Sequence, residues 1–134
     1  WRHLNKKRLN FIGYGGNGYQ VRDILHIDDL CEIVFMQVKK FKLVNNNTFN
    51  IGGGLKNSID LRDLTYISRK ITNANIKINK IKKTDNSDIP IYISSNKKIK
   101  KFYNWEPKKN ILEIAKDILN WQKNNFKILK KYFN

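Results

Sequence analysis

Arg22 is the residue of this sequence best suited to hold a phosphate group. It is one of only five arginines among 27 basic residues, it follows a glycine-rich stretch, and it precedes a predicted helix. The planar guanidinium can form two parallel, charge-assisted hydrogen bonds with a phosphate. It can equally form a structural salt bridge, for example with Asp23, and the residue types alone leave both interpretations open.

Other kinds of reactive site are not indicated by the sequence. Two histidines, His3 and His26, and the single cysteine, Cys31, do not make a zinc site, so no metal is expected. The chain has neither a GxSxG nucleophile motif nor a GxxxxGK[ST] phosphate loop. We therefore predict no catalytic residue in this chain.

The glycine-rich stretches predict loops. Residues 13–18 hold four glycines, but they run into Gln20–Asp23, which predicts an extended segment where a dinucleotide fingerprint requires a helix. Gly52–Gly54 follows a predicted strand, yet the next helix starts several residues later and no acidic residue stands at the required distance. Neither stretch is expected to bind a cofactor.

The elements that must position Arg22 alternate between strands and helices. Strands are expected at 9–12, 48–51, 76–78 and 91–93, with an extended segment at 21–27 and a turn at 45–47. Helices are expected from 28 or 29 to about 42, from 61 to 71, from 97 to 103, and from 111 through 129. Asp29, followed by Glu32, is expected to cap the first helix, whereas Asp60 and Asn73 bound the second. This order predicts a small mixed α/β region.

Apolar residues at helical spacing predict which side chains are buried. The first helix is expected to bury Leu30, Ile33, Val34, Val38 and Phe41, and the last to bury Ile111, Ile114, Ala115, Ile118 and Leu119. Cys31 is expected to be a small buried residue, and Trp105 and Trp121 are expected to anchor the core. A short segment at 1–10 is expected to be the tail of a helix.

Length and composition bound the class of protein. The 134 residues suffice for one domain, and a hydrophobic content of 40% supports a core. No apolar run approaches the roughly 20 residues that span a bilayer. A lone cysteine cannot form an internal disulfide, which agrees with a cytoplasmic location. The chain begins with Trp1, so we expect it to be part of a longer protein.

The net charge of +16 raises nucleic acid as a partner. The excess is mostly lysine and is scattered over the whole chain, and the abundant Lys, Asn and Ile are residues that AT-rich codons encode. We favour the hypothesis that genomic drift toward AT-rich codons has placed lysines at solvated surface positions, which makes nucleic acid an unlikely partner. A basic nucleic-acid-binding domain is kept as an alternative function.

Gly15-Gly16 and the following segment Gln20–Leu30, QVRDILHIDDL, resemble a signature of the extended short-chain dehydrogenases/reductases that act on nucleotide-activated sugars. These form the NAD-dependent epimerase/dehydratase family. The similarity continues in order at 49–54 (FNIGGG), 104–108 (NWEPK) and 118–121 (ILNW). Within the family the chain looks most like the CDP-paratose 2-epimerase (CDP-tyvelose epimerase) branch. Any one motif is weak, whereas their succession at family spacing is specific.

The resemblance implies that residues 1–134 form the C-terminal substrate-binding region, normally appended to a Rossmann domain that is absent from this chain. That domain binds NAD and carries the catalytic Ser/Thr and Tyr-x-x-x-Lys pair. Tyr66 and Lys70 have this spacing, but they fall on a predicted helix with an apolar stripe and later than the family pair would occur. The parent protein would be an isomerase that 2-epimerises a CDP-linked sugar, and a homo-oligomer. This chain alone would be inactive, and an inactive remnant is a further alternative.

The same resemblance implies a nucleotide-diphosphate sugar as partner and assigns three residues to it. Arg22 would bind the diphosphate, Gln20 would line the nucleotide site, and Asp88 corresponds to a family acidic residue near the nucleotide. His26 and Asp29 would be structural, with His26 packed beneath the loop. Two positions depart from the family: Asp85 stands where the family usually has Arg, and Ser95 where it usually has Asp. A carboxylate at position 85 would repel a diphosphate, with Lys83 nearby as a substitute cation.

Overall fold

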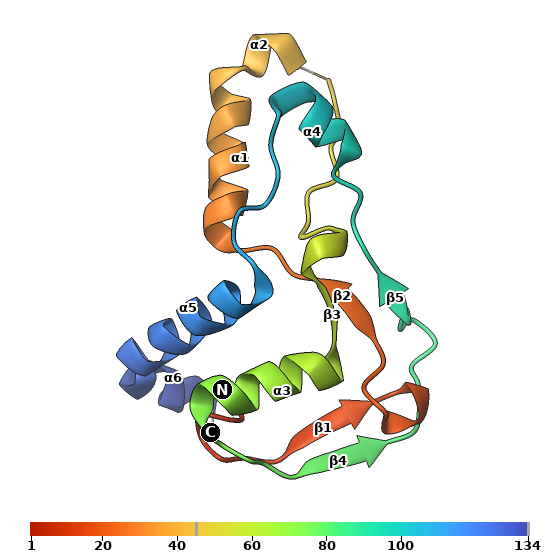
Figure 1. Ribbon diagram of the computed structural model, residues 1–134, viewed down its shortest axis with the longest axis vertical. Coiled ribbons are helices and arrows are strands. Elements are labelled where there is room, and N and C mark those ends of the chain that lie inside the picture. Colours follow the sequence, from red (N-terminus) through yellow and green to blue (C-terminus); the bar gives the residue numbers. More distant parts are fainter. Residues whose placement is uncertain (45, 134) are drawn as a thin grey trace. The chain divides into compact units, whose positions relative to one another are not determined.

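A computed structural model describes residues 1–44 and 46–133, and its elements group into two units. Unit 1 consists of Trp1–Gln20, Asp60–Pro90 and Leu112–Asn134, and unit 2 of Val21–Ile59 and Ile91–Ile111. Each unit contains both helices and strands, as labelled in Figure 1. The predicted mixed α/β class is confirmed.

Unit 1 is built on a pair of parallel strands. β1 (Leu9–Ile12) pairs with β4 (Ile78–Ile81), with Leu9 opposite Ile78 and Ile12 opposite Ile81 (Figure 1). The 3-10 helix η1 (Tyr14–Gly16) follows β1 directly. The helices of this unit are α3 (Leu61–Thr72), α5 (Ile111–Asn124), which starts one residue before the unit boundary, and α6 (Phe126–Tyr132). Its buried apolar side chains are Phe11, Ala74, Ile76, Ile114 and Leu119.

Helix α3 has the boundaries that its local signals predicted. The carboxylate of Asp60 accepts a hydrogen bond from the Asp63 amide at 2.8 Å, which satisfies one of the free N–H groups at the helix start. Arg62 forms an ion pair with the same carboxylate. Asn73 ends the helix in the left-handed conformation at φ 50°.

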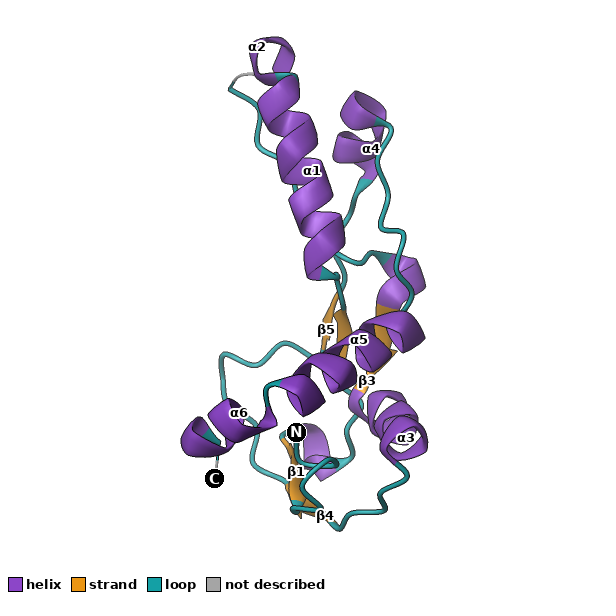
Figure 2. Ribbon diagram, turned by 90° about the vertical axis from the view of Figure 1, so that its left-hand side faces the viewer, coloured by secondary structure: helices purple, strands orange, loops and turns teal. Residues whose placement is uncertain are grey.

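Unit 2 combines a three-stranded sheet with two helices that share a core. The sheet has the order β3-β2-β5, made of Ser58–Asp60, Val21–Asp23 and Ile91–Tyr92. The helices are α1 (Ile27–Lys39), α2 (Phe41–Val44) and α4 (Lys97–Tyr103), with the 3-10 helix η2 at Leu55–Asn57. Helices α1 and α4 lie side by side in both Figure 1 and Figure 2, and Ile33, Ile99, Tyr103 and Trp105 form the buried cluster.

The first turn of α1 corrects the predicted cap. His26, not Asp29, is the capping residue, because its Nδ1 accepts a hydrogen bond from the Asp28 amide at 3.1 Å. Asp29 is the third residue of the helix and is only 3% exposed. Its two carboxylate oxygens accept hydrogen bonds from the backbone amides of Lys108 and Lys109, both at 3.2 Å. The carboxylate therefore joins α1 to the segment after α4.

Several predicted elements were wrong for identifiable reasons. Residues 48–51 are not a strand, because Phe49 and Ile51 pack against the core of unit 2 while Gly52 is hydrogen-bonded by the Asn96 side chain. The short strand β3 was not predicted. The last helix is divided at Asn125, and residues 2–6 are turns rather than a helix. Residue 45 of the predicted turn lies outside the described residues.

On helices α1 and α5, the buried side chains differ from those that the spacing of apolar residues predicted. On α1 the inward stripe is Asp29 and Ile33, with Met36 packed against the core, so Cys31 faces away and is exposed. Val34, Val38 and Phe41 are 45%, 68% and 63% exposed. On α5 the prediction holds for Ile114 and Leu119, but Ile118 and Trp121 are exposed. Trp105 is the tryptophan that anchors a core.

Within the described residues, no helix is both long enough and apolar enough to cross a membrane.

Candidate functional site

Two of the three predicted ligand-binding residues contact each other in unit 1. Gln20 is 8% exposed, and its amide nitrogen donates to the Ile12 carbonyl and to Oδ2 of Asp88 at 3.4 Å. Both neighbours are acceptors, which fixes the orientation of the amide. The buried Oε1 of Gln20 then finds no hydrogen-bond donor among the described residues. An acceptor buried without a donor is costly, so this atom is suited to receive a donor from a bound molecule.

The glycine loop of unit 1 is tied to the segment that carries Asp88. The backbone amide of Tyr14 donates to the Thr84 hydroxyl at 2.7 Å, and the Tyr14 hydroxyl donates to the Asp88 carbonyl at 2.6 Å. The Gly13 amide donates to the Ile81 carbonyl at 2.9 Å. Sequence reasoning missed Tyr14 and Thr84 because their partners lie about 70 positions away. No local pattern marks such a contact.

Asp85 is engaged in its own turn. Its Oδ1 accepts hydrogen bonds from the Ser87 amide at 2.9 Å and the Ser87 hydroxyl at 2.5 Å, and its carbonyl accepts one from the Asp88 amide. The Ser87 hydroxyl, followed by the Ser87 amide, lowers the pKa of the Asp85 carboxyl, which favours the charged form. Asp85 therefore shapes the turn that presents Asp88.

The glycines serve close packing rather than a dinucleotide cradle. Residues 13–18 lead through η1 into the strand β2, whereas a dinucleotide fingerprint leads from a strand directly into an α-helix. A Cβ on Gly16 would approach the Lys80 backbone at 2.8 Å, and one on Gly18 would approach the Phe11 ring at 2.6 Å. In unit 2 a Cβ on Gly53 would meet the Ile24 carbonyl oxygen at 2.1 Å. At these three positions the glycines allow neighbouring segments to pack closely.

Arg22 lies in unit 2, at the middle of β2, opposite Tyr92 of β5. It is half-buried, and its Nη1 donates to the Val21 carbonyl at 2.8 Å. The adjacent Asp23 carboxylate accepts hydrogen bonds from the backbone amides of Gly54 and Ser94 at 2.9 and 3.1 Å. Asp23 thus joins three segments around the strand that carries Arg22.

Tyr66 and Lys70 form a surface contact on α3. The Lys70 ammonium lies 4.6 Å from the centre of the Tyr66 ring, and Tyr66 is 55% exposed. This is the ordinary i, i+4 pairing of a helix surface with a cation over an aromatic face. Among the described residues, no group of three or more His, Cys, Asp or Glu side chains is placed to hold a metal ion.

Comparisons with known proteins identify relatives over most of this chain. No family model matches it. It is 29% identical to CDP-paratose 2-epimerase from Salmonella typhi over 106 residues, which are 79% of this chain and 31% of that protein. It is 30% identical to UDP-glucuronate 4-epimerase from Thermodesulfobacterium geofontis over 115 residues, 86% of this chain and 34% of that protein. The chain thus spans about a third of the length of the curated relatives it matches.

The fold is shared with solved structures. The crystal structure of UDP-glucuronic acid 4-epimerase from Bacillus cereus, in complex with UDP-glucuronic acid and NAD, matches 92% of this chain with a TM-score of 0.81 at 20% identity. The match covers 37% of that chain and corresponds to its C-terminal part.

Proposed function

We propose that this chain supplies the nucleotide-sugar-binding part of a nucleotide-sugar epimerase, because its homologues are such enzymes. The observation that carries the proposal is the buried Gln20 amide beside Asp88, within a segment that resembles the family signature. The structural relative binds NAD, and the glycine loops of this chain do not fit that cofactor. When bound by the parent enzyme, NAD would supply the hydride acceptor. The residues of this chain would bind and orient the substrate.

Gln20 and Asp88 are proposed to contact the nucleoside of the substrate. The Gln20 Oε1 needs a donor, and the ring N–H groups and ribose hydroxyls of a nucleoside are donors. The Asp88 carboxylate contacts the Nε2 end of the same amide and, as an acceptor, suits a ribose hydroxyl. Both roles require the loop geometry that Tyr14 and Thr84 maintain.

Arg22 is proposed to bind the diphosphate. Arg22 lies in unit 2, whereas Gln20 and Asp88 lie in unit 1, so the proposal for Arg22 is argued from its neighbours in unit 2. The β2 backbone and the hydrogen-bonded Asp23 hold this strand in place, which orients the guanidinium. A preorganised guanidinium loses less entropy when it forms two hydrogen bonds to a phosphate.

The parent reaction is proposed to be 2-epimerisation of a CDP-linked sugar, in the cytoplasm and by a homo-oligomer. The segment QVRDILHIDDL, which looks like the CDP-paratose 2-epimerase branch, supports this choice. The two curated relatives are almost equally identical to this chain but differ in the nucleotide of their names. Titration of the chain with CDP and UDP in parallel distinguishes the two, and tighter binding of CDP is expected.

Arg22→Gln tests the diphosphate contact, with the exposed Arg8→Gln as a control that removes the same charge elsewhere. Loss of a charge-assisted, bidentate contact is expected to weaken CDP binding by about tenfold or more. Equal CDP affinity of the Arg22→Gln and Arg8→Gln variants refutes the role of Arg22.

Gln20→Leu tests the nucleoside contact, because leucine fills a similar volume without an acceptor. It should weaken the binding of both CDP and cytidine, whereas Arg22→Gln should weaken only that of CDP. The chain alone is expected to bind without turnover, because it holds one end of the substrate without a hydride acceptor. Epimerisation of a nucleotide sugar by this chain with added NAD would contradict the proposal.

A further inference from the structure

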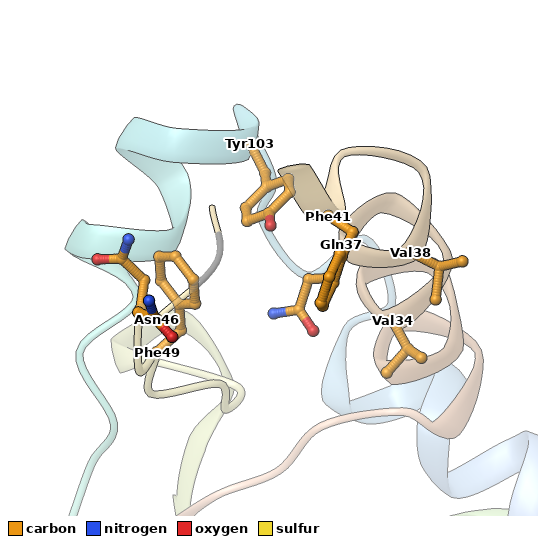
Figure 3. Close-up of a pocket in the computed structure, with 8 residues that line it drawn as sticks. Val34, Gln37, Val38, Phe41, Asn46, Phe49 and Tyr103 are labelled. Atoms are coloured by element: carbon orange, nitrogen blue, oxygen red, sulfur yellow. The ribbon is translucent and has the colours of Figure 1, made fainter. Parts of the chain in front are cut away.

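A hollow in unit 2 is lined by none of the three residues proposed to bind the nucleotide sugar. Its volume is about 320 Å³. It is formed between α1, the start of α2, the segment before Gly52, and the end of α4 (Figure 3). The lining side chains that matter here are Gln37, Phe41, Phe49 and Tyr103. Its size suits a ligand of one or two rings.

The Tyr103 hydroxyl marks this hollow as more than a surface depression. Tyr103 is only 2% exposed, and its hydroxyl finds no hydrogen-bond partner among the described residues. Figure 3 shows the hydroxyl directed into the space between Phe49 on one side and Gln37 with Phe41 on the other. A buried hydroxyl without a partner is destabilising, so a ligand group that hydrogen-bonds to it would be favoured.

The walls of the hollow are suited to a flat ring with polar edges. Phe49 meets Tyr103 edge to face, with ring centres 5.7 Å apart, and Phe41 stands on the opposite side of the space (Figure 3). The half-buried Gln37 amide faces the same space and offers both donors and an acceptor. Aromatic walls and an amide are the groups that recognise a heteroaromatic ring by stacking and by its edge.

Lysines add a positive charge to the same place. The Lys40 ammonium lies 5.9 Å from the centre of the Tyr103 ring, and that of Lys98 lies 5.1 Å from the centre of the Phe49 ring. Lys98 is held there by donating to the Thr48 carbonyl at 3.0 Å. Helix α4 also carries the exposed lysines Lys97 and Lys101, whereas Lys100 on the same helix forms an ion pair with Glu106. A ligand that enters the hollow should therefore be an anion.

We propose that this hollow binds a nucleotide, with the base beside Phe49 and the Tyr103 hydroxyl and the phosphate near Lys40 and Lys98. The ligand is a planar heteroaromatic ring that bears a phosphate. It can come from a free nucleotide or from a base of a single-stranded nucleic acid. This second nucleotide site does not depend on Arg22, Gln20 or Asp88.

The test uses the full chain with two probes, AMP and an eight-residue oligodeoxyadenylate. Tyr103→Phe removes only the hydroxyl, and Tyr66→Phe, on the exposed surface of α3, is the matched control. Tyr103→Phe is expected to weaken probe binding about fivefold, the usual worth of one hydrogen bond, and Tyr66→Phe to leave it unchanged. Because the hydroxyl has no partner without ligand, Tyr103→Phe should fold as well as the parent chain.

Photo-crosslinking with 8-azido-AMP, followed by peptide mass spectrometry, locates the site. Labelling is expected within residues 34–49 or 97–105 and should persist in Arg22→Gln, which separates this site from the proposed diphosphate contact. Similar affinities for AMP and the oligonucleotide indicate a free nucleotide, whereas binding of the oligonucleotide alone indicates a single strand. Absence of binding by both probes, labelling confined to other residues, or equal affinity of Tyr103→Phe and Tyr66→Phe overturns the proposal.

Discussion

Asp29 offers the sharpest test of how unit 2 is held together. Its carboxylate is 3% exposed and accepts hydrogen bonds from the backbone amides of Lys108 and Lys109 at 3.2 Å each. Asp29→Ala removes both acceptors and leaves two backbone donors without a partner from this side chain. The neighbouring Asp28 side chain is 72% exposed, so Asp28→Ala changes the same charge in the same helical turn without loss of a buried acceptor.

The magnitude follows from these two bonds. A hydrogen bond to a charged group contributes about 1.5–3 kcal/mol to stability. Both bonds are longer than the usual 2.9–3.0 Å, so the lower figure applies to each. Asp29→Ala should therefore destabilise unit 2 by about 3 kcal/mol. Asp28→Ala removes a favourable charge at a helix start, for which about 0.3–1 kcal/mol is expected, and the contact of this exposed carboxylate with His26 Nδ1 at 3.4 Å.

The assay is urea unfolding followed by the fluorescence of Trp105. This residue is buried in unit 2, whereas Trp1 and Trp121 lie in unit 1. A Trp1→Phe, Trp121→Phe background makes Trp105 the sole reporter. With a slope of about 1–1.5 kcal/mol/M for a small unit, the loss for Asp29→Ala corresponds to a midpoint lowered by about 2–3 M.

An intermediate substitution separates the two hydrogen bonds. Asp29→Asn keeps one carbonyl acceptor and should lose about half of the effect of Asp29→Ala. The order Asp28→Ala, Asp29→Asn, Asp29→Ala in increasing loss is therefore expected. If Asp29→Ala and Asp28→Ala shift the midpoint equally, the carboxylate does not join α1 to the segment at 108–109, and this account of unit 2 is wrong.

Three further outcomes follow from single residues. Asp60→Ala should destabilise unit 1 by about 1–2 kcal/mol at neutral pH. Burial raises the pKa of the Asp60 carboxyl, but the hydrogen bonds from the Asp63 amide and Arg62 outweigh burial, so the pKa is lowered. The stabilisation by Asp60 is therefore present above the ordinary pKa of aspartate and is lost as the pH falls through the lowered pKa. Urea midpoints of the parent and Asp60→Ala chains at pH 7 and pH 3 would detect this loss. Burial, followed by Arg69 and the amino terminus, lowers the pKa of His3. The contribution of neutral His3 to the stability of unit 1 is therefore complete above about pH 6.5 and is lost as the pH falls through the pKa of the folded state. His3→Phe should flatten the pH dependence of the thermal midpoint of unit 1 between about pH 7.5 and 5. Cys31 is exposed and should react with a thiol reagent in the folded chain as fast as in urea, whereas protection in the folded state would contradict its placement.

Local signals predicted the elements whose causes are local. Helix α3 has its cap, its ion pair and its left-handed end within the span from Asp60 to Asn73, so the sequence there carried all that was needed. Strand β1 was likewise found at its predicted bounds. The role of Asp29 was missed because its partners lie 79 and 80 positions away. A capping-box pattern cannot distinguish such a residue from the true cap at His26.

In the candidate site, too, features with local causes were predicted and contacts between distant segments were not. The resemblance assigned Gln20 and Asp88 separately to the nucleotide, and no rule of spacing predicts that two residues 68 positions apart are in contact. Tyr14 and Thr84 escaped prediction altogether, since a hydroxyl that binds a distant backbone group leaves no periodic trace. The glycines were correctly expected to form loops. Their close approach to Lys80, Phe11 and Ile24 depends on segments that local sequence does not specify.

Helix α1 shows what hydrophobic periodicity measures. The pattern correctly placed Ile33 in a core, but it assigned Val34 and Val38 to the same buried face, and both are largely exposed. Periodicity reports which side chains lie on one side of a helix, while burial depends on whether another segment covers that side. Within unit 2, α4 covers only the stripe through Ile33, because Ile99 and Tyr103 are the large side chains directed at it. The width of an apolar stripe is therefore an upper limit on what a helix buries, and the facing element decides how much of it is used.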